Sequence, residues 1–123
     1  VEYTKERLVQ GGPLAGKQLT QQKLVFMLTE ITKAQLLALQ LGRLKDAGQY
    51  DHTMVSMAKR NNVDIALRIA RDARDLLGGN GLLLENHVAR HLTDMEVVHT
   101  YEGTDFIQSL IIGRQITGIS AFA

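Results

Sequence analysis

The longest uninterrupted stretch of the sequence, from Gln18 to about Ala47, is the feature that most restricts the fold. It contains no proline and a single glycine, Gly42. Its apolar residues recur at steps of three and four, the spacing of one face of an α-helix. They are Leu24, Met27, Leu28, Ile31, Ala34, Leu37, Ala38, Leu41 and Leu44. A helix of about 28 residues would be about 40 Å long at about 1.5 Å per residue, so it would span a whole small domain.

The segment after Gly48 predicts a second long helix. Asp51 carries the side-chain oxygen that an N-cap needs, and it stands directly before the next periodic segment. Gly78 and Gly79 end that segment and are suited to form its C-terminal cap. Its stripe consists of Met54, Val55, Ala58, Asn62, Ile65, Ala66, Ile69, Ala73 and Leu76. Two long helices joined by a short loop are expected to lie antiparallel.

Shorter elements are predicted on both sides of this pair. Residues Val1 to about Val9 favour a helix, which the breaker cluster Gly11-Gly12-Pro13 would stop. A short helix is expected from His87 to Leu92. Residues Thr93 to Tyr101 are interpreted as a connector, because Val97 and Val98 suit either a turn of helix or an extended link.

The last helix is expected to begin at Thr104, whose hydroxyl can cap it, and to run to Gly118. Its apolar residues cannot all face one seam. They include Phe106, Ile107, Leu110, Ile111 and Ile112. Two explanations are open: the helix is fully central, or it forms a subunit interface.

Length and composition agree with one all-α domain. A chain of 123 residues with 45% hydrophobic and 22% charged residues matches ordinary globular domains. The predicted architecture is an antiparallel four-helix-type bundle over residues 1–123, packed by aliphatic side chains because aromatic residues are scarce. The first residue is not Met and the opening residues resemble the end of a helix, so we expect a piece of a longer protein.

Charge and cysteine usage exclude several function classes. The net charge of +1 with interspersed signs provides no field that would collect nucleic acid or an anionic membrane. The absence of cysteine excludes a thiolate nucleophile, a disulfide framework and a zinc ribbon. No apolar run approaches the roughly 20 residues of a transmembrane helix, so no membrane association is expected.

Candidates for chemistry are few. His87 and His91 stand four apart and could meet a metal from one face, but two ligands are too few, so no metal is predicted. The cluster Gly78-Gly79-Asn80-Gly81 is either a helix cap with a turn or a nest of backbone N–H groups for a phosphate. Glu102 is either a residue that complements the dipole of the last helix or a catalytic base, because Gly103 leaves room for a ligand beside it.

Three stretches together resemble the C-terminal helical domain of the acyl-CoA dehydrogenases. They are Ala73-Arg74-Asp75-Leu76-Leu77-Gly78-Gly79-Asn80-Gly81, Tyr101-Glu102-Gly103-Thr104 and Ile112-Gly113-Arg114-Gln115-Ile116-Thr117-Gly118-Ile119. The glutaryl-CoA dehydrogenase branch also shares Leu41-Gly42-Arg43-Leu44-Lys45 and Lys59-Arg60-Asn61-Asn62. The resemblance covers essentially the whole chain and implies that an N-terminal helical domain and a middle β-domain precede it in the longer protein.

The resemblance assigns roles to eight positions. Glu102 would be the base that takes the α-proton of an acyl-CoA thioester, and Tyr101 and Gly103 would line the acyl pocket. Binding of FAD would involve the remaining five: Arg7, Gln18, Asp75, Gly79 and Thr104. Asp75 and Gly79 match positions that reach the FAD of a neighbouring subunit. The isolated chain is expected neither to retain FAD nor to be active, because most cofactor and thioester contacts would belong to other parts.

The family also implies a homo-oligomer, dimer or tetramer, and electron-transfer flavoprotein as the oxidant. In the glutaryl branch, decarboxylation follows the α,β-dehydrogenation. The expected location is the cytoplasm for a bacterial protein and the mitochondrial matrix for a eukaryotic one. The chain departs from the family at Leu8-Val9-Gln10-Gly11, where a polar residue and a Phe usually precede the glycine. The alternatives are an acyl-CoA oxidase of the same fold and a non-catalytic helical interaction module.

Overall fold

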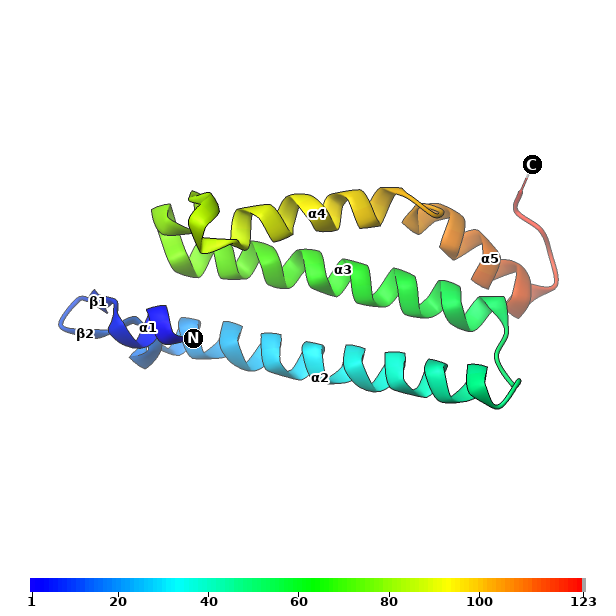
Figure 1. Ribbon diagram of the computed structural model, residues 1–123, viewed down its shortest axis with the longest axis horizontal. Coiled ribbons are helices and arrows are strands. Elements are labelled where there is room, and N and C mark those ends of the chain that lie inside the picture. Colours follow the sequence, from blue (N-terminus) through cyan, green and yellow to red (C-terminus); the bar gives the residue numbers. More distant parts are fainter. Residues whose placement is uncertain (123) are drawn as a thin grey trace.

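Helices make up almost all of the computed structural model, which describes residues 1–122. Two long antiparallel helices, α2 (Gln18–Asp46) and α3 (His52–Leu77), lie side by side (Figure 1). A third row consists of α4 (Val88–Thr100) and α5 (Asp105–Thr117), which follow one another along α3 (Figure 1). The prediction of an all-α, antiparallel helical bundle is confirmed.

The helix ends follow the sequence signals. The Asp51 carboxylate accepts hydrogen bonds from the backbone N–H groups of Thr53 at 2.7 Å and Met54 at 3.1 Å, so it caps α3 as predicted. Gly78 ends α3 at a φ of +57°. The Thr104 hydroxyl accepts from the backbone N–H of Ile107, and Gly118 ends α5 in the left-handed region. These predicted boundaries of α3 and α5 are therefore confirmed.

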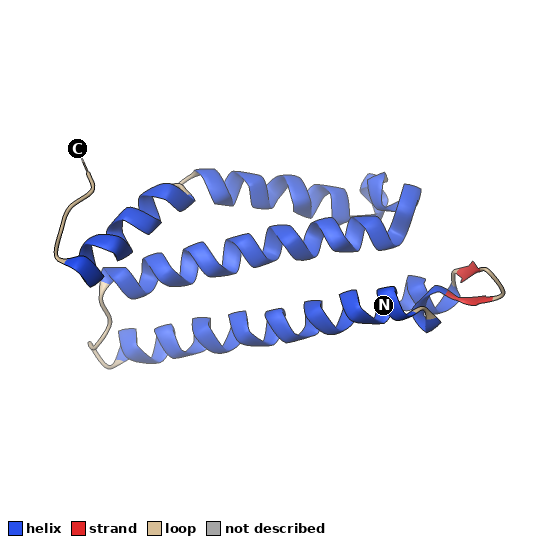
Figure 2. Ribbon diagram, turned by 180° about the vertical axis from the view of Figure 1, so that it is seen from behind, coloured by secondary structure: helices blue, strands red, loops and turns tan. Residues whose placement is uncertain are grey.

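Two predictions of local structure are wrong. The predicted connector is helical, because α4 continues to Thr100 and packs along α3, where Arg71 and Glu96 form an ion pair at 2.8 Å. The first helix is shorter than predicted, since α1 covers only Glu2–Glu6. A small hairpin of β1 (Leu8–Val9) and β2 (Gly12–Pro13) follows it, shown in red in Figure 2. A 3-10 turn, η1 (Leu14–Gly16), leads into α2.

Contacts between α2 and α3 are a mixture of polar and apolar. Lys23 pairs with Asp72 at 2.8 Å, and the Arg68 guanidinium lies 4.0 Å from the centre of the Phe26 ring. The amide of Asn62 donates to the backbone carbonyl of an α2 residue at 3.2 Å. Between the helices lies an apolar hollow of about 260 Å³, lined by Ile31, Ala34, Gln35, Ala38, Asn62, Ile65, Ala66 and Ile69. The pair is thus held together at points rather than by a continuous core.

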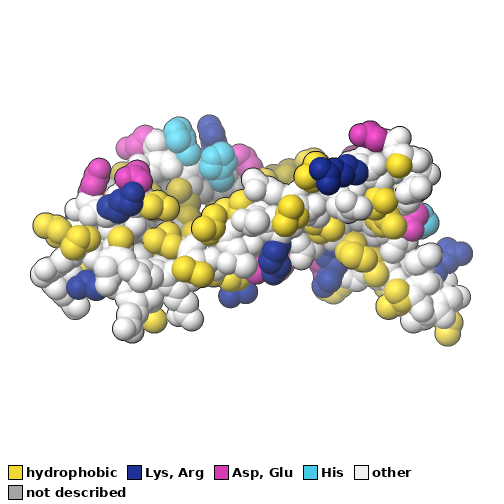
Figure 3. Space-filling view, turned by 90° about the horizontal axis from the view of Figure 1, so that it is seen from below, with side chains coloured by type: hydrophobic (Ala, Val, Ile, Leu, Met, Phe, Trp, Pro, Cys, Tyr) yellow, Lys and Arg dark blue, Asp and Glu magenta, His cyan; other side chains and the backbone are white. Residues whose placement is uncertain are grey.

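Much apolar surface is exposed. Among the described residues, Ala58 and Leu67 are the only buried hydrophobic residues, at 7% and 5% exposure. On the α2 side, hydrophobic side chains recur along the length of the molecule (Figure 3), and Leu19, Val25, Leu28, Leu36 and Leu39 are among those exposed. In α5, Phe106 is 82% and Ile116 is 78% exposed, so α5 is not a fully central helix. Both α2 and α5 therefore carry apolar side chains that the packing within one chain leaves exposed.

The apolar character of α2 has a further consequence. An 18-residue window of α2 reaches a mean hydropathy of 1.3, so this helix has the length and the composition to cross a bilayer, contrary to the expectation from the apolar runs. A core helix of a soluble protein can have the same length and composition. In this chain, α2 carries Glu30 and Lys33 as an ion pair at 2.7 Å in its middle. The paired charges and the packing on α3 favour a bundle helix.

Candidate functional site

The predicted site residues form two groups at different points along α3. We define the glycine end as Gly78–Gly81 together with α1 and the residues that follow it. We define the Glu102 turn as residues 101–104, between α4 and α5. Lys59 contacts the Glu102 turn and Asp75 lies at the glycine end, and both belong to α3. Sixteen positions separate them, which is about 24 Å at about 1.5 Å per residue.

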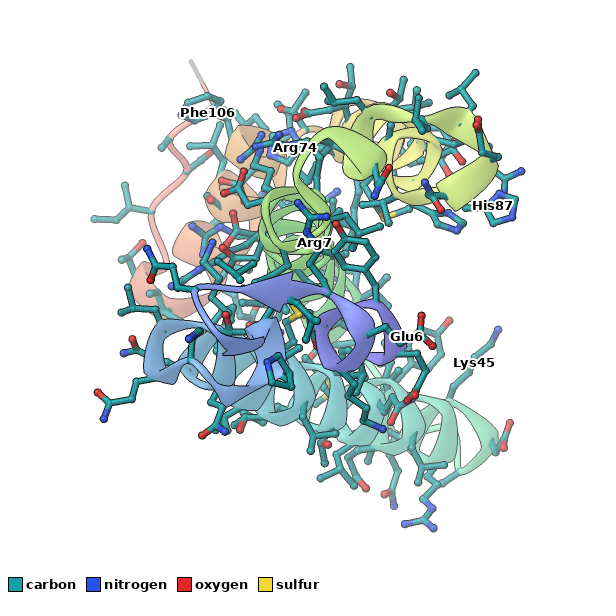
Figure 4. All side chains as sticks on the ribbon, turned by 90° about the vertical axis from the view of Figure 1, so that its left-hand side faces the viewer. Glu6, Arg7, Lys45, Arg74, His87 and Phe106 are labelled. Carbon is teal, nitrogen blue, oxygen red and sulfur yellow. The ribbon has the colours of Figure 1, made fainter. Side chains whose placement is uncertain are left out.

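The glycine end contains a hollow of about 480 Å³ that brings together Arg7, Asp75 and Gly79. Three of the five predicted cofactor residues therefore meet: Arg7 directly after α1, Asp75 in α3 and Gly79 in the 3-10 turn η2 (Gly78–Leu82). Figure 4 looks onto this end and labels Arg7. Tyr3, Val9, Leu14, Leu76, Leu77, Gly78 and Asn80 complete the lining. Gln18, at the first position of α2, is exposed and is not part of this lining.

Charges at the glycine end are distributed unevenly. Asp75 pairs with Arg74 and, at 3.5 Å, with Lys23, so its carboxylate is already contacted by two cations. Arg7 is exposed and belongs to none of the ion pairs found within residues 1–122. Its guanidinium is free to bind an anion such as a phosphate, since planar bidentate recognition suits arginine.

The glycines of this cluster serve different purposes. Among the three, only Gly78 has a positive φ. A Cβ on Gly81 would lie 2.4 Å from the Arg74 carbonyl oxygen, so Gly81 is required by close backbone packing. A Cβ on Gly79 would meet nothing within 4 Å. Gly79 thus leaves open space on the wall of the hollow, which fits the approach of a bound group such as FAD.

The Glu102 turn has an unusual backbone. Glu102 adopts a φ of +54° and Gly103 a φ of +87°. A left-handed glutamate costs about 1–2 kcal/mol, so the surrounding structure must hold it there. Gly103 is needed for its torsion and for space, because a Cβ would lie 2.6 Å from Gln108 Nε2. In the direction of a Cβ, the space beside Gly103 is taken by the Gln108 amide, so the expectation that this space is open to a ligand is wrong on that side of the glycine.

Two side chains hold the carbonyl groups of the turn. Lys59 Nζ donates to the carbonyl oxygens of Tyr101 and Gly103. Gln108 Nε2 donates to the carbonyl oxygens of Glu102 at 3.0 Å and Gly103 at 3.2 Å. Gln108 is only 7% exposed. Three successive carbonyl groups are therefore bound, while the Glu102 side chain remains exposed.

The surroundings of Glu102 suit a reactive carboxylate. Thr104 accepts one hydrogen bond from Ile107, and its own hydroxyl proton is still available for a bound group. The positive end of the α5 dipole begins directly after the turn, which favours an anion there. Tyr101 is 53% exposed beside Glu102. The turn thus presents a carboxylate, a phenol and a hydroxyl to whatever lies against this side of the chain.

Sequence reasoning missed Lys59, Arg60 and Gln108. Arg60 pairs with Asp105 at 2.9 Å and ties the start of α5 to α3. Lys59 lies 42 positions before Tyr101, so no local pattern connects the two. Gln108 was within reach of prediction, because it lies one helical turn after the Thr104 cap, where a long polar side chain can reach back to the turn.

The histidine pair forms no metal site. His87 is exposed at the start of α4 and points away from the body of the molecule in Figure 4. Across residues 1–122, no group of three His, Cys, Asp or Glu side chains could hold a metal ion.

Comparison with known proteins identifies the family. The family model described as acyl-CoA dehydrogenase, C-terminal domain, matches residues 1–117. The chain belongs to the acyl-CoA dehydrogenase family. An acyl-CoA dehydrogenase from Bacillus subtilis is 36% identical over 118 residues, which are 96% of this chain and 31% of that protein. The short-chain specific enzyme from Megasphaera elsdenii is 34% identical over 92% of this chain and 30% of its own length.

Solved structures agree with this assignment. A glutaryl-CoA dehydrogenase from Mycobacterium smegmatis in complex with FADH2 is 47% identical and superimposes with a TM-score of 0.96, over 99% of this chain and 32% of that chain. A structure described as an electron transferring flavoprotein of Acidaminococcus fermentans is 27% identical with a TM-score of 0.89, over 94% of this chain and 30% of that chain. The chain spans about a third of the length of the relatives it matches.

Proposed function

We propose that this chain is the C-terminal domain of an FAD-dependent acyl-CoA dehydrogenase of the glutaryl-CoA type. The supporting observation is the Glu102 turn, where a strained backbone is held from two sides and an exposed carboxylate stands at the start of α5. Identity of 47–48% to the Mycobacterium smegmatis glutaryl-CoA dehydrogenase, against 32–36% to the curated relatives, favours the glutaryl branch.

In this proposal Glu102 is the base. Its carboxylate accepts the α-proton of the acyl-CoA thioester, and Tyr101 and Gly103 flank the acyl chain. FAD, when bound, provides the acceptor for the hydride that leaves the β-carbon. The Thr104 hydroxyl would donate a hydrogen bond to the cofactor, because its oxygen already accepts a hydrogen bond as the cap of α5. A positioned base of this kind contributes roughly 10²–10⁴-fold to the rate.

The separation of the two groups supports a homo-oligomer. Thr104 and Gly79 are both proposed FAD contacts, yet they lie near opposite ends of a helix segment of about 24 Å. We propose that Thr104 binds the cofactor of its own subunit, whereas Asp75 and Gly79 reach the cofactor of a neighbour. Arg7 supplies a cation for the flavin phosphates, and Gln18 contacts the adenosine part from the first turn of α2. Exposed apolar residues of α2 and α5 provide area for subunit contacts.

The substrate and electron partner follow from the same proposal. The substrate is an acyl-CoA, glutaryl-CoA in the first instance, with decarboxylation after dehydrogenation. We propose electron-transfer flavoprotein as the electron acceptor, as the resemblance to the family implies. The proposed location is the cytoplasm in a bacterium and the mitochondrial matrix in a eukaryote.

The test is Glu102→Gln in the full-length protein that carries this chain, with Glu85→Gln as the control. Glu85 is also an exposed glutamate close to a glycine cluster, but it lies in η3 (Leu84–Asn86), outside the Glu102 turn. Flavin reduction by glutaryl-CoA and by butyryl-CoA is followed by anaerobic stopped-flow absorbance. We expect the Glu102→Gln variant to retain FAD, with a rate of flavin reduction by substrate roughly 10²–10⁴-fold below that of the parent. The Glu85→Gln variant should have the parent rate.

The outcome separates the base from a purely structural carboxylate. A residue that only complements the α5 dipole would show near-normal turnover and a stability loss of about 0.3–1 kcal/mol. A reduction rate within about tenfold of the parent would refute the assignment of Glu102 as the base. Turnover of the parent with oxygen alone, at the rate seen with electron-transfer flavoprotein, would indicate an oxidase instead of a dehydrogenase.

A further inference from the structure

The carbonyl groups around Glu102 are bound by donors that come from two different helices. Lys59 belongs to α3 and contacts the carbonyl oxygens of Tyr101 and Gly103. Gln108 belongs to the first turns of α5 and contacts those of Glu102 and Gly103. The Gly103 carbonyl receives both donors. We call Lys59 and Gln108 the carbonyl clamp.

The clamp explains how a glutamate stays in the left-handed region. Residues with a side chain avoid a φ near +54° unless their neighbours enforce it. The direction of the Cα–Cβ bond depends on the backbone conformation of the same residue, so release of the clamp would reorient the Glu102 carboxylate. Lys59 Nζ reaches the carbonyl groups on either side of Glu102, so it has the position and the donors to fix this turn.

The position of α5 does not depend on the clamp alone. Arg60 ties Asp105 to α3 at 2.9 Å, and Thr104 caps the helix by itself. These contacts involve Thr104 and residues of α5, whereas the clamp binds only the carbonyl groups of Tyr101, Glu102 and Gly103. Loss of the Lys59 ammonium should therefore leave α5 in place and release the backbone on either side of Glu102.

We propose that Lys59 and Gln108 are positioning residues that orient Glu102 for proton abstraction. This inference rests on the proposed function of Glu102 as the base. Neither residue touches the reacting atoms, so the clamp acts on the rate of the chemical step and not on the affinity for acyl-CoA. Misplacement of a catalytic group by about 1 Å can cost roughly 100-fold in rate.

The test compares Lys59→Met with Arg71→Met in the full-length holoprotein. Arg71 is a matched control, because it is also a cation on α3 that contacts the α4 row, through Glu96 at 2.8 Å. The measurements are FAD content, melting temperature, flavin reduction by glutaryl-CoA and the Kd of the non-reducible thioether S-butyl-CoA. We expect Lys59→Met to lower the reduction rate by about 10–100-fold and to leave the S-butyl-CoA Kd within about threefold. Arg71→Met should retain the parent rate.

Conservative replacement separates positioning from general stability. Lys59→Arg keeps a cation that can donate to two carbonyl groups, so it should recover most of the rate that Lys59→Met loses. A rate for Lys59→Met within about twofold of the parent would overturn the proposal. It would also be overturned if Arg71→Met lost as much rate for the same fall in melting temperature, or if Lys59→Arg were no better than Lys59→Met.

A second variant covers the case in which Lys59→Met fails to fold or to hold FAD. Gln108→Met removes the other donor at similar side-chain volume. We expect it to lose as much of the reduction rate as Lys59→Met, with an unchanged Kd for S-butyl-CoA. A parent-like rate for Gln108→Met would refute the role of the clamp. Glu102→Gln is measured in parallel. A parent-like Glu102→Gln would overturn the proposed function and this inference with it. A slow Glu102→Gln beside a parent-like Lys59→Met and Gln108→Met would overturn this inference alone.

Discussion

Replacement of Gly81 by alanine tests the packing of the glycine end. The added Cβ would lie 2.4 Å from the carbonyl oxygen of Arg74 and 3.0 Å from its Cα, whereas ordinary contacts begin at 3.4 Å. A backbone oxygen inside α3 cannot rotate away as a flexible side chain could, so Gly81 and its turn must move by about 1 Å. Overpacking of this kind costs about 1–3 kcal/mol, and contact with three backbone atoms of Arg74 places this case in the upper half of that range.

Gly79→Ala is the matched control two positions earlier. Its Cβ meets nothing within 4 Å and its φ is not positive, so the alanine should be neutral or stabilise the chain by about 0.5 kcal/mol through the unfolded state. Thermal melting of the 123-residue chain, followed by circular dichroism at 222 nm, compares the two. Gly81→Ala should lower Tm by roughly 8–12 °C at about 4 °C per kcal/mol, and Gly79→Ala should not lower it. Equal melting temperatures for the two variants would refute the packing argument.

The remaining predictions concern α3, the cofactor and self-association. The backbone hydrogen bond from Met54 lowers the pKa of Asp51 below its ordinary value of 3.8. The contribution of the ionised Asp51 is therefore complete well above pH 3.8 and is lost as the pH falls through the lower folded pKa. Asp51→Ala should lower the urea midpoint at pH 7, and the difference from the parent should shrink as the pH is taken below 3.8. The isolated chain should neither retain FAD nor oxidise glutaryl-CoA; a yellow, active preparation would contradict this. Its exposed apolar residues should make it at least a dimer in sedimentation equilibrium, and a monomer at all concentrations would count against that expectation.

The Glu102 turn and the glycine end are two clusters of predicted site residues that do not meet within one chain. The Glu102 turn presents the Glu102 carboxylate, the Tyr101 phenol and the Thr104 hydroxyl. The glycine end presents Arg7 and a hollow with open space at Gly79. About 24 Å of α3 keeps them apart. In the proposed oligomer, each copy would thus contribute one half of two different sites.

Local signals in the sequence determined the helices and their ends. Asp51 and Thr104 offered side-chain oxygens to the first backbone N–H groups of α3 and α5, and Gly78 and Gly118 supplied the left-handed residues that end them. Such interactions span three or four positions, so they can be recognised without knowledge of the fold. The same holds for the apolar stripe of α2, whose period is a property of the helix itself.

Tertiary structure decided the features that depend on distant partners. Val97 and Val98 left the end of α4 ambiguous in sequence, and packing along α3 made it helical. Gly81 looked like another turn glycine, but its role comes from the Arg74 carbonyl of a neighbouring segment. The Lys59 contact with the Glu102 turn joins residues more than 40 positions apart. The sequence could name Glu102, but the orientation of its carboxylate depends on long-range hydrogen bonds, which no local pattern encodes.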